Sequence, residues 1–284
     1  MPQAHNAVDA HSSEGEMHWR AHPNGLGHTV VGDVRVLSGL KSPQLDNKRD
    51  IAVYLPPSYA RSHRHYPVLY MHDGQNIFDN ALSYVGEWQV DESMEMLAQE
   101  GLEAIVVGIP NAGVERLNEY SPFRDPKHGG GKGQAYLEFL IQTVKPLVDL
   151  EFRTLPGREN TGVMGSSMGG LISLYAYYRF PQVFGKAGVI SPSFWFAEGA
   201  IYGYVEGAAQ VAGKLYMDVG YREITLSHVS SRRYLEGVRR MDKLLLQKGW
   251  RPGQDYQYLE DKEGVHNEAH WARRFPEVMR FLFG

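Results

Sequence analysis

The pattern of apolar and polar positions divides the predicted strands into two kinds. Residues 29–37 and 50–55 alternate between polar and apolar side chains, which is typical of antiparallel strands with one face in water. The runs at residues 68–71 and 104–107 are apolar throughout, as expected for strands buried on both faces of a parallel sheet. The remaining predicted strands, with these two runs extended, cover residues 68–72, 104–109, 161–165, 187–190, 214–219 and 255–259.

Helical periodicity occupies the segments between these strands. Residues 134–150 place their apolar side chains on one stripe, and Pro146 is expected to kink this helix or end its first half. The other predicted helices cover residues 89–99, 167–178, 230–248 and 268–283. Strands that alternate with helices of this length predict an α/β fold. We expect a mostly parallel sheet of about eight strands, with helices on both faces and an antiparallel N-terminal edge.

One domain accounts for most of the 284 residues. The glycine-rich run at residues 129–133 lies between a predicted strand and its following helix, so it is interpreted as a surface loop rather than a linker. Residues 1–27 lack the apolar core of a secretory signal and are expected to be loosely ordered. The predicted domain therefore covers residues 28–284.

Composition and charge argue against several functional classes. Hydrophobic residues make up 43% of the chain and charged residues 22%, which is typical of a globular protein. The net charge of −4 lacks the basic excess of a nucleic-acid-binding protein. The chain has no cysteine, which excludes disulfides, thiolate zinc sites and a cysteine nucleophile. No apolar run reaches 18 residues, so we expect no membrane span and a cytoplasmic location.

The strongest chemical signal is at residues 165–170, which read Gly-Ser-Ser-Met-Gly-Gly between a predicted strand and a predicted helix. G-x-S-x-G in this context is the nucleophile elbow, a tight turn that exposes a serine hydroxyl at a helix N-terminus. Ser167 has glycine two positions before and two positions after it, whereas Ser166 has methionine at both. Ser167 is therefore the candidate nucleophile. The alternative interpretation is a glycine-rich turn without chemistry.

A serine nucleophile needs a base, and the base needs an orienting acid. In this type of fold the acid follows the serine along the chain and the histidine comes last. Glu223 lies in the loop after a predicted strand and is preferred as the acid over Asp218, which lies within that strand. His266, between the last strand and the last helix, is preferred as the base over His270, which lies inside the helix.

Two backbone N–H groups are expected to hold the oxyanion that forms on the substrate. One belongs to Met168, the residue after the nucleophile. The other is assigned to Gln75, because Gly74 permits a turn that aims the next N–H into the site. The alternative for this second segment is a simple turn at the end of a strand.

No metal or cofactor site is expected. The chain has twelve histidines, but no H-E-x-x-H spacing occurs and no G-x-G-x-x-G motif follows a strand. His228 comes too soon after Glu223 to act as the base and is interpreted as a surface helix residue.

Taken together, these motifs resemble the Putative esterase family of α/β-hydrolases, which includes siderophore esterases, feruloyl esterases, esterase D and the antigen 85 mycolyltransferases. The matching segments lie at residues 72–75, 107–110, 119–122, 165–170, 220–223 and 266–271. The resemblance implies a small-molecule ester as substrate and no cofactor. It also implies His266 as base, Glu223 as acid and Gln75 as the second oxyanion donor. Some family members carry aspartate where this chain has Glu223.

Two tryptophans are candidate substrate-binding residues. Trp88 follows the proposed oxyanion loop, and its assignment rests on the resemblance. Trp195 belongs to an aromatic run at residues 194–196 that would either line an acyl pocket or cap the core. The predicted function is that of a serine carboxylic-ester hydrolase acting through an acyl-serine. The alternatives are an acyltransferase of the same fold that uses an alcohol acceptor, and an inactive binding homologue.

Overall fold

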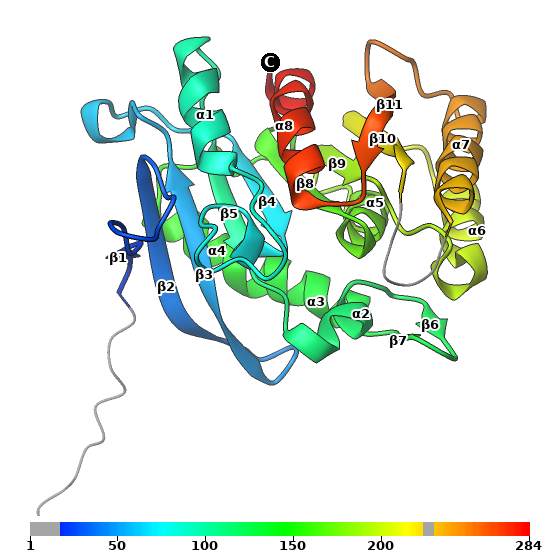
Figure 1. Cartoon of the computed structure of the whole chain (residues 1–284), viewed down its shortest axis with the longest axis horizontal. Coiled ribbons are helices and arrows are strands. Elements are labelled where there is room, and N and C mark those ends of the chain that lie inside the picture. Colours follow the sequence, from blue (N-terminus) through cyan, green and yellow to red (C-terminus); the bar gives the residue numbers. More distant parts are fainter. Residues whose placement is uncertain (1–17, 224–229) are drawn as a thin grey trace, which may run out of the picture.

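A nine-stranded sheet forms the centre of the part of the chain that the computed structural model describes, residues 18–223 and 230–284. The strand order is β1-β2-β3-β5-β4-β8-β9-β10-β11 (Figure 1). The strands are β1 (Arg20–Ala21), β2 (Asp33–Ser42), β3 (Asn47–Leu55), β4 (Val68–His72), β5 (Ile105–Ile109), β8 (Thr161–Ser166), β9 (Lys186–Ile190), β10 (Lys214–Arg222) and β11 (Tyr256–Val265).

The sheet has an antiparallel part at its N-terminal edge and a parallel part over the remaining strands. β1, β2 and β3 pair antiparallel, and β3 pairs antiparallel with β5. From β5 to β11 every pairing is parallel. The predicted α/β class with an antiparallel N-terminal edge is therefore confirmed, and the short β1 is the strand beyond the expected eight.

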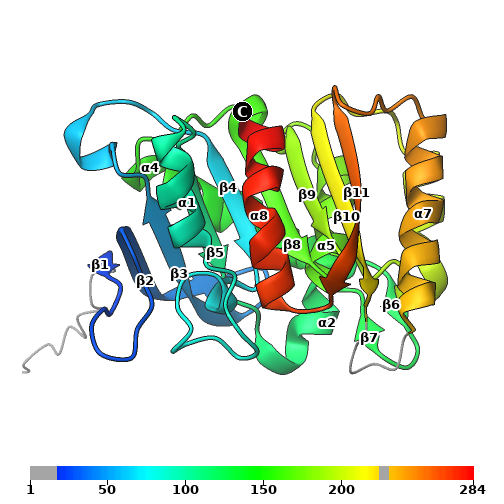
Figure 2. The same cartoon turned by 45° about the horizontal axis from the view of Figure 1, so that its top comes forward.

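Helices cover both faces of the sheet (Figure 2). They are α1 (Val90–Gln99), α2 (Arg116–Glu119), α3 (Gly133–Phe139), α4 (Lys145–Glu151), α5 (Met168–Arg179), α6 (Ala200–Gly207), α7 (Ser231–Gln247) and α8 (Glu268–Phe283). α1 and α8 lie together on one face, and α3 to α7 contribute to the apolar layer on the other. The sequence pattern does not predict α2 and α6, because helices this short show too little periodicity.

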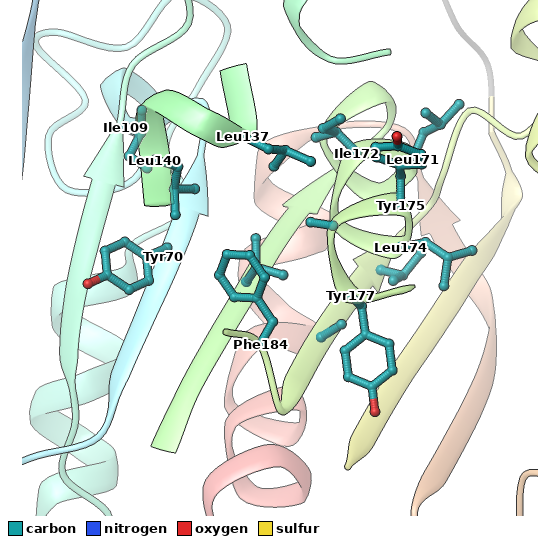
Figure 3. Packing of buried hydrophobic residues seen from close by; sticks show 14 of the residues in the cluster. Tyr70, Ile109, Leu137, Leu140, Leu171, Ile172, Leu174, Tyr175, Tyr177 and Phe184 are labelled. Carbon is teal, nitrogen blue, oxygen red and sulfur yellow. The ribbon is translucent and has the colours of Figure 1, made fainter. Parts of the chain in front are cut away.

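Two apolar layers enclose the sheet because neighbouring residues of a strand point to opposite faces. In β4, Val68 and Tyr70 join the layer under α5, whereas Leu69 and Met71 join the layer under α1 and α8. Figure 3 shows Tyr70 and side chains of α5, such as Leu174, within the first layer. The side chains of the site described below are attached to these packed strands and helices. The core therefore holds those side chains in place.

Pro146 interrupts the predicted helix over residues 134–150, as expected. Regular α-helix ends at Phe139, a π-helical turn covers Leu140–Val144, and α4 begins at Lys145 with Pro146 in its first turn. Proline lacks an N–H and cannot take part in an unbroken α-helical ladder. The wider π turn before it accommodates this loss.

The glycine-rich run at residues 129–133 is more ordered than a plain loop. Gly129–Gly130 forms β7, which pairs antiparallel with β6 (Arg124–Asp125). Gly130 has a φ of 95°, and a Cβ there would overlap the carbonyl oxygen of Phe123, so glycine is needed at this position. Asp125 accepts a hydrogen bond from the backbone N–H of Ala197, which ties this hairpin to the segment after β9.

Three further expectations from the sequence concern the N-terminal segment, His228 and membrane-spanning helices. The expected loosely ordered segment, residues 1–27, is described from residue 18 onward, and β1 lies within it. His228, interpreted as a surface helix residue, lies outside the described residues. Within the described ranges, no helix has the length and apolar character needed to cross a membrane.

Candidate active site

Ser167 stands on a sharp turn between β8 and α5. Its φ of 58° and ψ of −118° belong to a region that residues other than glycine rarely adopt, which is the strain expected of a nucleophile elbow. A Cβ on Gly165 would lie 3.0 Å from the backbone of Gly169 and 3.0 Å from His72 Cδ2. A Cβ on Gly169 would meet His72 Cβ at 3.4 Å. The close packing of this turn therefore explains the glycine spacing on either side of Ser167.

A chain of hydroxyl groups runs from Ser167 towards His266. The Oγ of Ser167 lies 3.0 Å from Ser193 Oγ, and Ser193 Oγ lies 2.9 Å from the hydroxyl of Tyr234. The Tyr234 ring packs edge-on against the His266 ring, with 5.0 Å between the centroids. Tyr234 thus contacts both His266 and Ser193, the hydrogen-bond partner of Ser167. Ser166, the alternative nucleophile, is the last residue of β8 and is 4% exposed.

His266 and Glu223 form a short hydrogen bond. The distance from His266 Nδ1 to Glu223 Oε2 is 2.6 Å, and Glu223 is fully buried. A carboxylate only accepts hydrogen bonds, so Nδ1 carries the proton and Nε2 is left to act as a base. The other carboxylate oxygen, Oε1, accepts from the Gly220 N–H at 2.5 Å and from the Ser191 hydroxyl at 2.6 Å.

The two rejected candidates have different surroundings. Asp218 forms a buried ion pair with Arg274, in which Nε lies 2.8 Å from Oδ2 and Nη2 lies 3.1 Å from Oδ1. Burial raises the pKa of Asp218 to about 6, although Arg274 acts in the opposite direction. His270 lies in the first turn of α8, and its Nδ1 is buried without a hydrogen-bond partner among the described residues. The carboxylate that contacts His266 is therefore that of Glu223.

Gly74, in the loop after β4, does not have the role expected from the sequence. The left-handed residue of this turn is Asp73, with a φ of 57° and a ψ of 42°. Gly74 is required for a different reason, because a Cβ there would overlap the backbone of Gly108 and Ile109 in β5. The turn that directs the chain into Gln75 thus comes from Asp73, and Gly74 lets the loop pass close over the neighbouring strand.

Side chains that follow β5 hold this loop. The guanidinium of Arg116 donates to both carboxylate oxygens of Asp73, at 2.8 and 2.7 Å, and Asn111 Nδ2 donates at 2.6 Å. The Asp73 N–H donates to the hydroxyl of Tyr120 at 2.9 Å, and the Asn111 N–H donates to Gln75 Oε1 at 3.1 Å. Burial alone would raise the pKa of Asp73, but these donors hold it below its ordinary value. Sequence reasoning missed Arg116 and Asn111, because nothing in their spacing connects them to Asp73.

The two candidate substrate-binding tryptophans differ in exposure. Trp88 is 3% exposed and packs against Trp271 with 5.6 Å between ring centroids, so its position favours a core role. Trp195 is partly exposed, and its ring meets that of His128 at 5.9 Å. The Arg233 guanidinium lies 6.0 Å from the centroid of Trp195. Only Trp195 of this pair offers surface to a ligand.

The aromatic run after β9 divides between the two expected roles. Phe194 and Phe196 are 1% and 0% exposed and belong to the apolar layer under α5. Trp195 lies between them at the surface of that layer, 6.4 Å from the ring of Tyr234. The run therefore caps the core with two side chains and turns the third towards the candidate site.

A cavity of about 340 Å³ lies beside the loop after β4. Gly74, Gln75 and Asn111 line one side of it, and residues of β2 and β3 line the other, including Lys48 and Asp50. The cavity thus adjoins the residue whose N–H is the expected second oxyanion donor.

One group of carboxylates in the described part of the chain is close enough to share a cation. It consists of Glu87, Asp91 and Glu92, whose ligand atoms lie within 4.8 Å of one another. Burial raises the pKa of Glu87 to about 7 and also raises that of Asp91. Because of these raised pKa values, bound protons offset the repulsion between the carboxylates as well as a cation would.

A family model identifies the family to which the chain belongs. A family model described as Putative esterase matches residues 42–282. The chain is 27% identical over 255 residues to Uncharacterized protein YbbA of Bacillus subtilis (strain 168). This match covers 87% of the chain and 98% of YbbA.

Solved structures show the same fold at lower identity. The chain is similar to an IroE-like serine hydrolase from Shewanella oneidensis, with a TM-score of 0.72 and 19% identity over 88% of this chain and 80% of the other. It is also similar to a CE1 ferulic acid esterase from Anaeromyces mucronatus, with a TM-score of 0.65 and 21% identity over 93% and 94% of the two chains. These likenesses confirm the predicted α/β-hydrolase fold.

Proposed function

The chain belongs to the Putative esterase family and is a carboxylic ester hydrolase, and from this premise we propose that it acts through an acyl-serine formed on Ser167. In this proposal His266 is the general base and Glu223 is the orienting acid. The observation that carries it is the 2.6 Å hydrogen bond between His266 Nδ1 and Glu223 Oε2, together with the strained elbow on which Ser167 stands. This combination of nucleophile, base and buried acid is the requirement for nucleophilic catalysis by serine.

Acylation begins with the transfer of the Ser167 proton. The hydroxyl turns from Ser193 towards His266 Nε2, gives up its proton and attacks the ester carbonyl carbon. Hydrogen bonds of this kind are commonly loose before substrate binds and tighten in the reacting complex. Glu223 keeps the proton on Nδ1 and stabilises the imidazolium that forms. The imidazolium then protonates the leaving alcohol.

The negative charge on the former carbonyl oxygen is held by two backbone N–H groups. Met168 is the first residue of α5, where the N–H groups have no partner within the helix and the helix dipole favours negative charge. The Gln75 N–H follows the Asp73 turn that Arg116 and Asn111 hold in place. Donors fixed before the reaction stabilise the transition state more than the substrate.

Deacylation repeats these steps with water. His266 removes a proton from water, the hydroxide attacks the acyl-serine, and Ser167 leaves with the proton that the imidazolium returns. All the groups required are side chains and backbone amides of this chain, so the reaction needs no cofactor. The proposed substrate is a small-molecule ester.

The test of this proposal is turnover of a nitrophenyl ester by the wild-type protein and by S167A. We expect a burst of nitrophenol followed by steady turnover in the wild type, and loss of both in S167A. An equal yield of the free carboxylic acid with and without added glycerol identifies water as the acceptor. Retained turnover in S167A would overturn the assignment of the nucleophile, and an acylated glycerol product would identify a transferase.

A further inference from the structure

Ser191 is a fully buried serine in an unusual backbone conformation. It directly follows β9, and its φ of 39° lies in the left-handed region that residues with a side chain rarely adopt. Its backbone N–H donates to Asp218 Oδ1 at 3.1 Å, and Asp218 is paired with Arg274. The buried ion pair therefore holds the backbone of Ser191 in a conformation that would otherwise be costly.

The hydroxyl of Ser191 has three partners, and their chemistry fixes the direction of its hydrogen. Trp271 Nε1 lies 3.2 Å from Ser191 Oγ and Arg274 Nη2 lies 3.1 Å from it. The indole N–H and the guanidinium only donate hydrogen bonds, so together they occupy both lone pairs of the hydroxyl oxygen. The hydroxyl hydrogen must then point to its third partner, Glu223 Oε1, at 2.6 Å.

As a consequence, the two carboxylate oxygens of Glu223 have different hydrogen-bond partners. Oε1 accepts from the Ser191 hydroxyl and from the Gly220 N–H, whereas Oε2 is left for His266 Nδ1. Two donors on one oxygen prevent the carboxylate from rotating about its last bond. The titratable and charged groups that face this carboxylate are His266 and the Arg274–Asp218 pair, and Arg274 also contacts Ser191.

We propose that Ser191 is a positioning residue for the reaction, which holds the Glu223 carboxylate in the orientation that fixes the His266 tautomer. This inference rests on the proposed function, because it assigns a role within the same set of residues. Ser191 touches neither the nucleophile nor the substrate in this scheme. Its removal should therefore lower kcat and leave KM unchanged, since only a step that charges the imidazole depends on it.

The experiment compares S191A and S191G with the wild type. Both variants remove the hydroxyl, but S191G also relieves the strain of the positive φ, so the two should differ in melting temperature. We expect kcat for a nitrophenyl ester to fall about 10- to 100-fold in both, as the loss of a hydrogen bond to a charged group implies. The matched control is S42A, which removes the hydroxyl of another fully buried serine, one that accepts from the Leu45 N–H.

A spectroscopic readout separates positioning from stability. The Nδ1 proton of His266 should give a far-downfield proton NMR signal, identified by its loss in H266Q, because the hydrogen bond to Glu223 is short. We expect this signal to shift or disappear in S191A and S191G and to persist in S42A. A kcat within threefold of wild type together with an unmoved signal would overturn the role of Ser191.

The outcome also distinguishes this inference from the proposed function. If S167A is inactive while S191A and S191G keep full activity and the NMR signal, only the role of Ser191 fails. If S167A retains turnover, the proposed nucleophile fails, and the NMR signal still tests whether Ser191 orders the pair formed by Glu223 and His266.

Discussion

Arg116 binds Asp73 with both arms of its guanidinium, at 2.8 Å from Nε to Oδ1 and 2.7 Å from Nη2 to Oδ2. Asp73 is the left-handed residue of the turn that leads to Gln75, so this ion pair fixes the direction of the proposed oxyanion donor. Planar, two-point contacts between arginine and carboxylate are geometrically specific, which a lysine would not reproduce.

R116Q should therefore lower kcat more than it raises KM. Loss of a whole oxyanion donor costs about 10²–10³ in kcat, and this is the upper limit for a variant that only loosens the loop. The matched control is R280Q, which breaks a similar two-point contact between Arg280 and Glu100 on the surface. Steady-state kinetics of both variants provide the test. Equal kinetics for R116Q and R280Q would show that the ion pair does not support the oxyanion loop.

S167A should remove most turnover, whereas S166A should keep it. The physical reason is that Ser167 occupies the strained elbow at the start of α5, whereas Ser166 is buried at the end of β8. Loss of a triad nucleophile costs about 10⁶ in kcat. A fluorophosphonate probe followed by peptide mass spectrometry identifies the labelled residue. Labelling of Ser166 would contradict this assignment.

E223Q should mainly lower kcat, whereas D218N should mainly lower the stability of the fold. Glutamine at position 223 removes the charge that holds the His266 tautomer, so kcat should fall by about 10⁴. Asparagine at position 218 removes the fully buried carboxylate of the Arg274 ion pair and leaves the guanidinium only Asp261, so the cost in folding free energy should approach about 3–5 kcal/mol. Kinetics and thermal melting of both variants give the comparison. Should D218N lose activity without losing stability while E223Q stays within threefold of wild type, the acid is Asp218.

The carboxylates near the start of α1 should make stability depend on pH. Burial raises the pKa of Glu87 from 4.5 to about 7 and also raises the pKa of Asp91 above its ordinary value. The folded protein then holds these protons more tightly than the unfolded chain does, so stability falls as pH rises from about 4.5 through 7.

E87Q and D91N keep the shape of these side chains but cannot lose a proton. Each variant should therefore flatten the decline in unfolding free energy, and D91N should extend this effect above pH 7. Urea denaturation at intervals between about pH 4 and pH 9 measures the slope. Slopes equal to that of the wild type in both variants would contradict the raised pKa values.

G74A should destabilise the protein, because the added Cβ would overlap the backbone of Gly108 and Ile109. Overpacking of this kind costs about 1–3 kcal/mol. The control is G203A in α6, where a Cβ meets nothing within 4 Å and alanine should stabilise the helix by about 0.5–1 kcal/mol. Thermal melting distinguishes the two signs. A G74A protein as stable as wild type would show that the loop shifts away from β5 without cost.

The features that depend on neighbours along the chain can be predicted from the order of the amino acids. The apolar run of β4 and the helix that follows Ser167 are visible because burial on two faces and helical spacing are local patterns. The elbow is visible because the strained turn requires glycine two positions from the serine. Glu223 could be preferred to Asp218 because a residue just beyond a strand end, unlike one inside it, is free to reach a neighbouring loop.

The features that depend on contacts between distant segments become visible once the chain is folded. Asp73 and Arg116 are 43 positions apart, and Ser191 and Arg274 are 83 positions apart, so no spacing rule links either pair. The same holds for Trp88, whose burial against Trp271 follows from the packing of the loop before α1 against α8. Local pattern therefore identifies the candidate reacting groups. The side chains that hold those groups in place come from wherever the fold brings a donor beside an acceptor.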